Sequence, residues 1–174
     1  MEYFDLISPI EDAIIDRLKD KTGNKVLVEP YPDNPESYEP THQVGALLVR
    51  YSDGNYSGAR TTDVIVQDRE MMFEVTLAMW SLRGRQGGIY SYLEAVRQIL
   101  TGFRPPDTSL KLVPVDEGYV NRSAGLRNKS QRLWQYQVTF RTQTVNIEIL
   151  VDPAEPLLKR ITAQDNLGNT TEVN

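Results

Sequence analysis

Residues 71–79, with the sequence MMFEVTLAM, show the cleanest alternation of side-chain type in the chain. Successive side chains of a strand point to opposite faces, so residues two apart share a face. One face would carry Met71, Phe73, Val75, Leu77 and Met79, and the other Glu74, Thr76 and Ala78. This pattern predicts a strand that is buried on one face and only partly covered on the other.

A helix is predicted before this strand, beginning in the sequence Ser-Pro-Ile-Glu at residues 8–11. Ser8 is expected to cap it, Pro9 suits the first helical position, and Glu11 completes a capping box. Apolar residues then recur at helical spacing and the helix should end near Thr22. These apolar residues are Ile10, Ile14 and Leu18.

A second helix is predicted over residues 88–101, with the sequence GIYSYLEAVRQILT. Gly102 is expected to end it, and the Pro105-Pro106 pair prevents the helix from resuming. Its apolar stripe consists of Ile89, Leu93, Val96 and Leu100.

Four further segments are predicted to be strands, namely residues 25–29, 45–51, 110–115 and 133–148. The proline-rich segment 30–43 is predicted to be a long loop, and residues 52–55 a turn that begins a mobile hairpin tip reaching Thr62. This order of elements predicts an α+β fold, a mostly antiparallel sheet with two helices packed on one face.

The predicted domain spans residues 1–148, and residues 149–174 form a C-terminal extension. The extension has two early prolines, Pro153 and Pro156, and few large apolar residues. It is therefore expected to be mobile in the free subunit and to become ordered on a partner. Its expected anchors are Leu157, Leu158 and Ile161.

The formal net charge is −5, and it is unevenly distributed. Residues 1–70 hold 7 Lys/Arg and 14 Asp/Glu, whereas residues 71–148 hold 10 and 6. Faces of opposite sign suit head-to-tail contacts between copies, although both could also be ordinary solvated surfaces.

The chain has no cysteine, which excludes disulfides and thiolate metal sites. It has no apolar run long enough to span a membrane and no basic N-terminal start, which predicts a cytoplasmic protein.

Candidate catalytic and ligand-binding residues are few. The single histidine, His42, has no nucleophile motif near it, and a loop or core-edge role is the better interpretation. The acid pairs Asp116-Glu117 and Asp152/Glu155 lack the spacing of a metal loop. The turn at 84–88 (GRQGG) precedes a helix but lacks a phosphate-loop pattern. We therefore expect no enzyme activity, no metal and no cofactor.

Basic residues gather in two places, and we expect both to lie at subunit interfaces. The first is the turn containing Arg83 and Arg85, and the second is the segment with Arg122, Arg127, Lys129 and Arg132. Tight nucleic-acid binding is disfavoured because the whole chain is acidic and no interleaved aromatic platform is evident. A basic rim on a subunit interface or a channel lining is the preferred interpretation.

Five segments in order resemble the gene-37-like family of Mu-type phages and prophages. They are GALLVRY (45–51), FEVTLAMWSLRG (73–84), GIYSYLEAVRQILTGFRPP (88–106), KLVPVDEGYV (111–120) and LWQYQVTFRTQTVNIE (133–148). The helix leading into LTGFRPP and the strand WQYQVTF are the most specific. The resemblance covers roughly residues 8–148, and the extension after Glu148 is a departure from it.

The resemblance implies a tail-terminator or tail-completion protein without catalytic residues. Such a protein would form a ring, expected to be six-fold, on the head-proximal end of a tail tube. The ring would end tube and sheath polymerisation and would offer a docking face to a neck protein or, in a headless contractile injection system, act as its cap. It would assemble in the cytoplasm of a bacterial host and then belong to the particle. Two alternatives stay open: another neck or baseplate adaptor, and an unrelated small-molecule-binding module.

Overall fold

The computed structural model describes residues 5–60, 64–84, 87–120, 133–147, 161–164 and 170–173, the last two ranges by their backbone only. The described residues form two helices, α1 (Ile7–Thr22) and α2 (Ile89–Leu100). The strands are β1 (Leu27–Pro30), β2 (Gly45–Tyr56), β3 (Val66–Met79), β4 (Val113–Tyr119), β5 (Trp134–Ile147), β6 (Ile161–Gln164) and β7 (Thr170–Val173). Two short 3-10 turns, η1 (Gly23–Lys25) and η2 (Pro35–Ser37), complete the elements.

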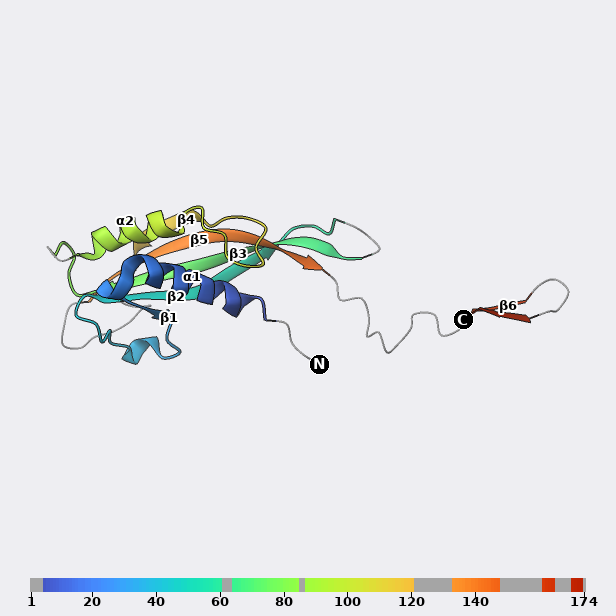
Figure 1. Ribbon diagram of the computed structural model, residues 1–174, viewed down its shortest axis with the longest axis horizontal. Helices are drawn as coiled ribbons and strands as arrows, with labels where there is room; N and C mark the ends of the chain where they lie inside the picture. Colours follow the sequence, from blue (N-terminus) through green and yellow to red (C-terminus); the bar gives the residue numbers. More distant parts are fainter. Residues whose placement is uncertain are drawn as a thin grey trace.

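Five strands form one sheet in the order β1-β2-β3-β5-β4. Only β1 and β2 are parallel, and the other neighbours are antiparallel. Both helices pack on the same face of this sheet (Figure 1). The predicted α+β architecture is therefore confirmed.

The core lies between the helices and the sheet. The nine residues with the strongest strand or helix periodicity are all buried: Met71, Phe73, Val75, Leu77, Leu93, Val96, Leu100, Val138 and Phe140. Cross-strand pairs align the two strand patterns, since Phe73 pairs with Phe140 and Val75 with Val138. Removal of this apolar surface from water is the main favourable term in folding.

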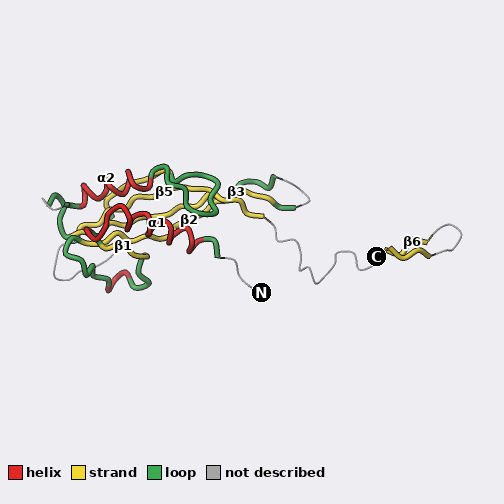
Figure 2. The backbone as a smooth tube through the Cα atoms, viewed as in Figure 1, coloured by secondary structure: helices red, strands yellow, loops and turns green. Residues whose placement is uncertain are grey.

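The loop of residues 31–44 covers part of the opposite face of the sheet. Tyr38 donates a hydrogen bond to the carboxylate of Glu29, and the Trp80 indole N–H donates to the carbonyl of His42 at 3.2 Å. Figure 2 shows this loop with its single helical turn, η2, beneath the sheet. A second, smaller apolar cluster lies there, made of Ala46, Leu48, Ala78 and Leu133 with Tyr31, Tyr38 and Trp80 at its edge. The loop and this cluster explain why the second face of the sheet is partly covered, as the alternation of residues 71–79 predicts.

The predicted capping box at the start of α1 is wrong. The helix begins at Ile7, and the carboxylate of Asp5 accepts from the amides of Ile7 and Ser8 at 2.9 and 3.1 Å. A carboxylate is a stronger acceptor than the Ser8 hydroxyl and is favoured by the helix dipole. Glu11 instead accepts a hydrogen bond from the amide of Tyr51 in β2.

The predicted turn at 52–55 is also wrong, because those residues continue strand β2 to Tyr56. The register shifts between Tyr51 and Asp53, where one extra residue forms an irregularity in the ladder. The Asp53 carboxylate accepts from the Gly54 amide at 2.7 Å, so the polar sequence serves a local bend within the strand. Further out, the Arg60 amide donates to the carbonyl of Val66 at 2.8 Å, and the tip at 61–63 lies outside the described residues.

The C-terminal extension contains two strands that the sequence analysis did not predict. Strands β6 and β7 pair with each other as a separate antiparallel sheet, with Ile161 opposite Val173. Their short, polar sequences have too little apolar periodicity to be recognised as strands.

We predict that Leu93→Ala lowers the free energy of unfolding by about 2–5 kcal/mol. Leu93 is 6% exposed and lies in the helix–sheet core, so truncation leaves a cavity. Leu110→Ala is the matched control, because Leu110 is 50% exposed and should change stability by no more than about 0.5 kcal/mol. Equal losses in urea denaturation of the two variants would contradict the placement of α2.

We predict that Glu11→Ala lowers the free energy of unfolding by about 1–3 kcal/mol, because the Tyr51 amide loses its acceptor. Glu11→Gln keeps an acceptor oxygen and should be close to the wild type near neutral pH.

The two Glu11 proteins should differ in their pH dependence. Burial raises the pKa of Glu11 above 4.5, against the opposing effect of the Tyr51 hydrogen bond. The folded wild type therefore binds a proton more tightly than the unfolded chain, and its stability rises as the pH falls through the raised pKa toward 4.5. Glu11→Gln lacks this gain. Parallel stability curves for the two proteins over that interval would contradict the prediction.

Candidate functional site

The predicted interface residues fall in different parts of the chain. Arg83 is exposed in the turn before α2, and its guanidinium carbon lies 5.6 Å from the centre of the Tyr90 ring. Ile161 is the first residue of β6, where only the backbone is described. The remaining predicted residues lie outside the described part of the chain: Arg85, Arg122, Arg127, Lys129, Arg132, Leu157 and Leu158.

The structure brings together the points where the two basic segments leave the fold. The segment 121–132 connects the end of β4 to the start of β5, and the Val120 amide donates to the carbonyl of Gln135 at 3.1 Å. Tyr119, at the end of β4, lies opposite Tyr136 of β5, with ring centres 5.5 Å apart. The Tyr136 ring in turn lies 6.0 Å from that of Tyr90 in the first turn of α2. The basic turn before α2 and the basic connection after β4 therefore leave the domain at the same end.

Four aromatic side chains mark this end, and we call them the aromatic cluster: Tyr90, Tyr119, Trp134 and Tyr136. Tyr136 and Trp134 are half-buried and pack against the main core. Tyr119 and Tyr90 are 52% and 38% exposed. The rings of Tyr119 and Tyr90 meet Tyr136 edge to face, an arrangement that aromatic pairs prefer. The cluster is thus held by the core at its base and is open to solvent at its rim.

The polar groups of the cluster are linked to one another. A hydrogen bond with the Tyr90 side chain is the largest cause of the raised pKa of the Tyr136 hydroxyl. Arg83 lies over the Tyr90 ring at cation–π distance. Exposed tyrosine beside arginine is the composition of strong protein–protein contact sites.

The glycine-rich turn before α2 has a structural role. The amide of Ile89 donates to the carbonyl of Ser81 at 3.0 Å, so the first helical amide already has a protein acceptor. A side chain at Gly88 would come within 2.4 Å of the Leu82 carbonyl oxygen, so only glycine fits this close approach of two backbones. This contact favours a structural role of Gly88 over a phosphate cradle.

His42 is held within the loop below the sheet. Its Nδ1 accepts from the amide of Val44 at 3.2 Å, and its carbonyl oxygen accepts from Trp80. The side chain is half-buried and links the loop to the start of β2. This geometry agrees with the predicted loop or core-edge role.

The predicted acid pairs do not form a metal site in the described part of the chain. Asp116 pairs with Thr139 and Glu117 with Val138, so the two carboxylates lie on opposite faces of β4. Asp152 and Glu155 lie outside the described residues. Within the described ranges, no group of three or more His, Asp or Glu side chains is placed to hold a metal ion. No described helix is long and apolar enough to cross a membrane.

Sequence reasoning missed Tyr90 and Tyr119 as site residues. Trp134 and Tyr136 lie on one face of β5 and pack against the main core. The position of Tyr119 beside them depends on the β4–β5 register, which also contains a shift between Pro114 and Asp116. The only local signal was an aromatic residue, Tyr119, between the predicted strand 110–115 and the basic segment.

Similarity to known proteins extends over most of the chain. No curated protein matches it significantly. A chain of a solved structure titled "Virion of native gene transfer agent (GTA) particle" aligns with 79% of this chain and 96% of its own length, at 13% identity and a TM-score of 0.44. A likeness at this level carries no functional inference.

A family model described as "Gp37 protein" matches residues 14–165. The match begins within α1, spans the whole five-stranded sheet and continues past Glu148 through β6. Part of the C-terminal extension, which was expected to depart from the family, therefore lies within the family match. On this evidence the chain belongs to the Gp37 protein family.

Proposed function

We propose that this protein is a non-enzymatic structural subunit that ends the tail of a phage or of a tail-like injection system. Copies form a closed ring, six-fold by the resemblance to Mu-type proteins, on the head-proximal end of the tail tube. The ring stops tube and sheath polymerisation and presents a docking face to a neck or cap protein. Membership of the Gp37 family and the motifs LTGFRPP and WQYQVTF support this role.

One observation supports the ring: the segment 30–43 beside β1 is acidic, whereas Arg83 and the segment 121–132 near the end of β4 are basic. Helix α1 packs over β1 and β2, at one side of the sheet, and α2 packs over β3 and β5 near the other. A contact between two different sides of the same subunit is heterologous, and it closes into a ring when its rotation divides the circle.

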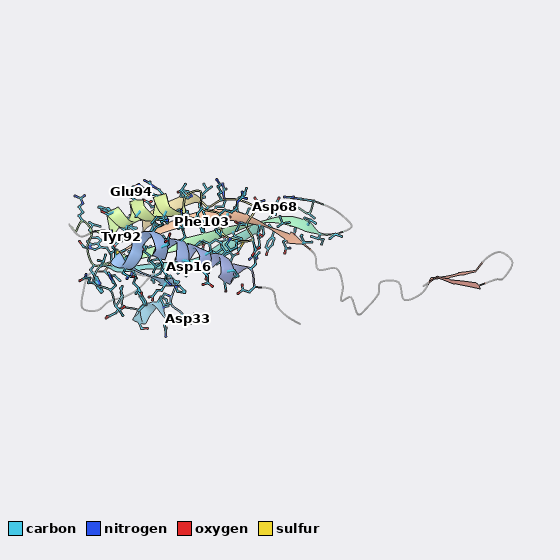
Figure 3. The ribbon with its side chains drawn as sticks, in the orientation of Figure 1. Asp16, Asp33, Asp68, Tyr92, Glu94 and Phe103 are labelled. Carbon is cyan, nitrogen blue, oxygen red and sulfur yellow. The ribbon has the colours of Figure 1, made fainter. Side chains whose placement is uncertain are left out.

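The loop that follows β1 is acidic. The segment 30–43 contains three Asp/Glu and no Lys/Arg. Asp33 from this segment and Asp16 from α1 are exposed. Figure 3 shows these two carboxylates on the lower part of the molecule, with Glu94 of α2 at the upper side.

The acidic loop is held in place by contacts with the sheet. The Tyr31 amide donates to the carbonyl of Val49 at 2.7 Å, and Arg50 lies 4.7 Å from the centre of the Tyr31 ring. Arg50 also pairs with Glu74 at 2.6 Å, and the Glu74 side chain is only 13% exposed. A preordered acidic surface loses less conformational entropy when it binds a partner.

The β4 side offers the complement. It carries the aromatic cluster with Arg83, and the basic segment 121–132 begins and ends beside Tyr119 and Trp134. Docking this end against the acidic loop of the next copy would pair opposite charges around an aromatic centre. The proposed function involves no tight direct nucleic-acid binding.

We predict that Tyr119→Ala weakens self-association at least tenfold, because truncation of a central interface aromatic costs about 2 kcal/mol or more. Arg83→Glu should weaken self-association more in low salt than in high salt, because salt screens the attraction between exposed charges. Arg97→Glu is the control, since exposed Arg97 pairs with Glu94 within α2. Native mass spectrometry and sedimentation, on the protein alone and with purified tube ends, measure the assembly.

Three outcomes would contradict the proposal. Equal self-association or tube binding by Tyr119→Ala, Arg83→Glu and the wild type would show that these residues do not form the interface. Particles of normal and uniform tail length after deletion of the gene would show that the protein does not end tail polymerisation. A tagged copy found at the baseplate end would favour the adaptor alternative.

A further inference from the structure

The outer edge of β5 is paired for only part of its length. Strand β4 pairs with β5 from Tyr136 to Arg141, whereas β3 pairs with β5 on the other side as far as Ile147. Within the described residues, the stretch 142–147 therefore has a strand neighbour only in β3. The amide and hydroxyl of Ser109 donate to the carbonyl of Gln143 at 2.7 and 3.0 Å. The Thr144 hydroxyl donates to the carbonyl of Asp107 at 3.0 Å, and beyond Thr144 no described strand continues the ladder.

This edge carries exposed apolar side chains. Val145 is 38% exposed and Ile147 is 60% exposed. Proteins usually protect such edges with charges, proline or a covering segment, because unpaired backbone groups pair with other strands. The opposite edge of the sheet shows this protection, since Glu11 binds the amide of Tyr51 where β1 no longer covers β2. Among the described residues, the β5 edge is covered in a comparable way only as far as Thr144.

A basic groove of about 540 Å³ lies where β4 separates from β5. Its lining has three cationic residues and one acidic residue, with Arg141 and Glu70 paired at 3.4 Å. Leu110 and Val113 are 50% and 46% exposed and supply its apolar surface. The lining residues are Glu70, Arg104, Leu110, Lys111, Val113, Arg141, Thr142 and Gln143. An occupant that matches this groove would be extended, acidic overall and partly apolar.

We propose that the outer edge of β5 at residues 145–147 binds the C-terminal strands of a second copy of this chain as added strands. Residues 149–174 contain four Asp/Glu and two Lys/Arg, the complement of the groove. Strands β6 and β7 are already extended, but among the described strands they pair only with each other. An isolated two-stranded hairpin is marginally stable, and addition to an existing edge supplies the third neighbour that it lacks.

The second copy is the occupant because the strands of the single chain do not use this edge. In one subunit β6 and β7 form their own sheet, separate from the sheet that contains β5. Exchange of the C-terminal strands between copies would link subunits through backbone hydrogen bonds. This link does not depend on the contact between the aromatic cluster and the acidic loop. A variant can therefore lose one of these two contacts and keep the other.

Cysteine cross-linking tests the exchange, because the chain has no cysteine of its own. One protein carries Val145→Cys, and a second, size-tagged protein carries Thr171→Cys or, to sample the neighbouring position, Glu172→Cys. With one thiol per chain, a disulfide between the two proteins can form only between copies. Ser91→Cys on the exposed surface of α2 replaces Val145→Cys in the control mixture.

We expect the Val145 mixture to form the mixed disulfide at least tenfold faster than the Ser91 mixture. Adding Lys111→Glu to the Val145→Cys chain should slow the reaction severalfold, and Arg97→Glu should leave it unchanged. Circular dichroism of each variant checks that the fold is retained. The same result in a Tyr119→Ala background would show that the exchange stands even where the ring contact has been removed.

Other outcomes would overturn the inference. Equal rates in the two mixtures would show that the edge does not receive the tail. A chain that carries both cysteines and cross-links within itself, independently of dilution, would assign the edge to its own tail. Capture of a tube or sheath protein at position 145, without capture of the tail, would assign the edge to a different partner.

Discussion

The pairing of β3 on both sides is the constraint on which the rest of the structure depends. Its residues 66–79 pair with β5, and residues 69–79 also pair with β2. Because side chains alternate along a strand, a shift of one residue in either register would move Phe73 and Val75 away from the helices. The burial of these side chains therefore fixes both neighbours of β3. Once they are fixed, β1 and α1 extend the fold on one side, and α2 and β4 extend it on the other.

Patterns that repeat along the chain predicted the core, whereas contacts between distant segments could not be predicted. The alternation of residues 71–79 and the stripe of α2 identified side chains that are buried. The same method gave Glu11 a local capping role, although its real partner, the Tyr51 amide, lies 40 residues away. The polar residues 52–55 suggested a turn but form an irregular part of β2. The aromatic cluster needed the pairing of β4 with β5, which neither strand's own sequence specifies.

The motifs that identified the family have a structural explanation. In LTGFRPP, Gly102 has a φ of +81°, and its amide donates to the carbonyl of Leu112 at 2.9 Å. The Leu112 amide donates back to Phe103 at 2.7 Å, while Phe103 packs against the core and lies under Arg17 at 5.4 Å. The motif thus ends α2 and returns the chain to the position where β4 begins. The residues of this motif therefore have a structural role in the fold.

The length of β4 relative to β5 creates both surfaces proposed for assembly. At one end of the pair, Tyr119 reaches Tyr136 and completes the aromatic cluster. At the other end, β4 begins only at Val113, opposite Arg141, so β5 runs on with an open edge and the basic groove forms beside it. A longer β4 would cover this edge and fill the groove. Glu11 closes the β2 edge of the sheet, whereas the β5 edge is open, so the two edges of the subunit are different. A closed ring requires contacts between two different surfaces of the same subunit.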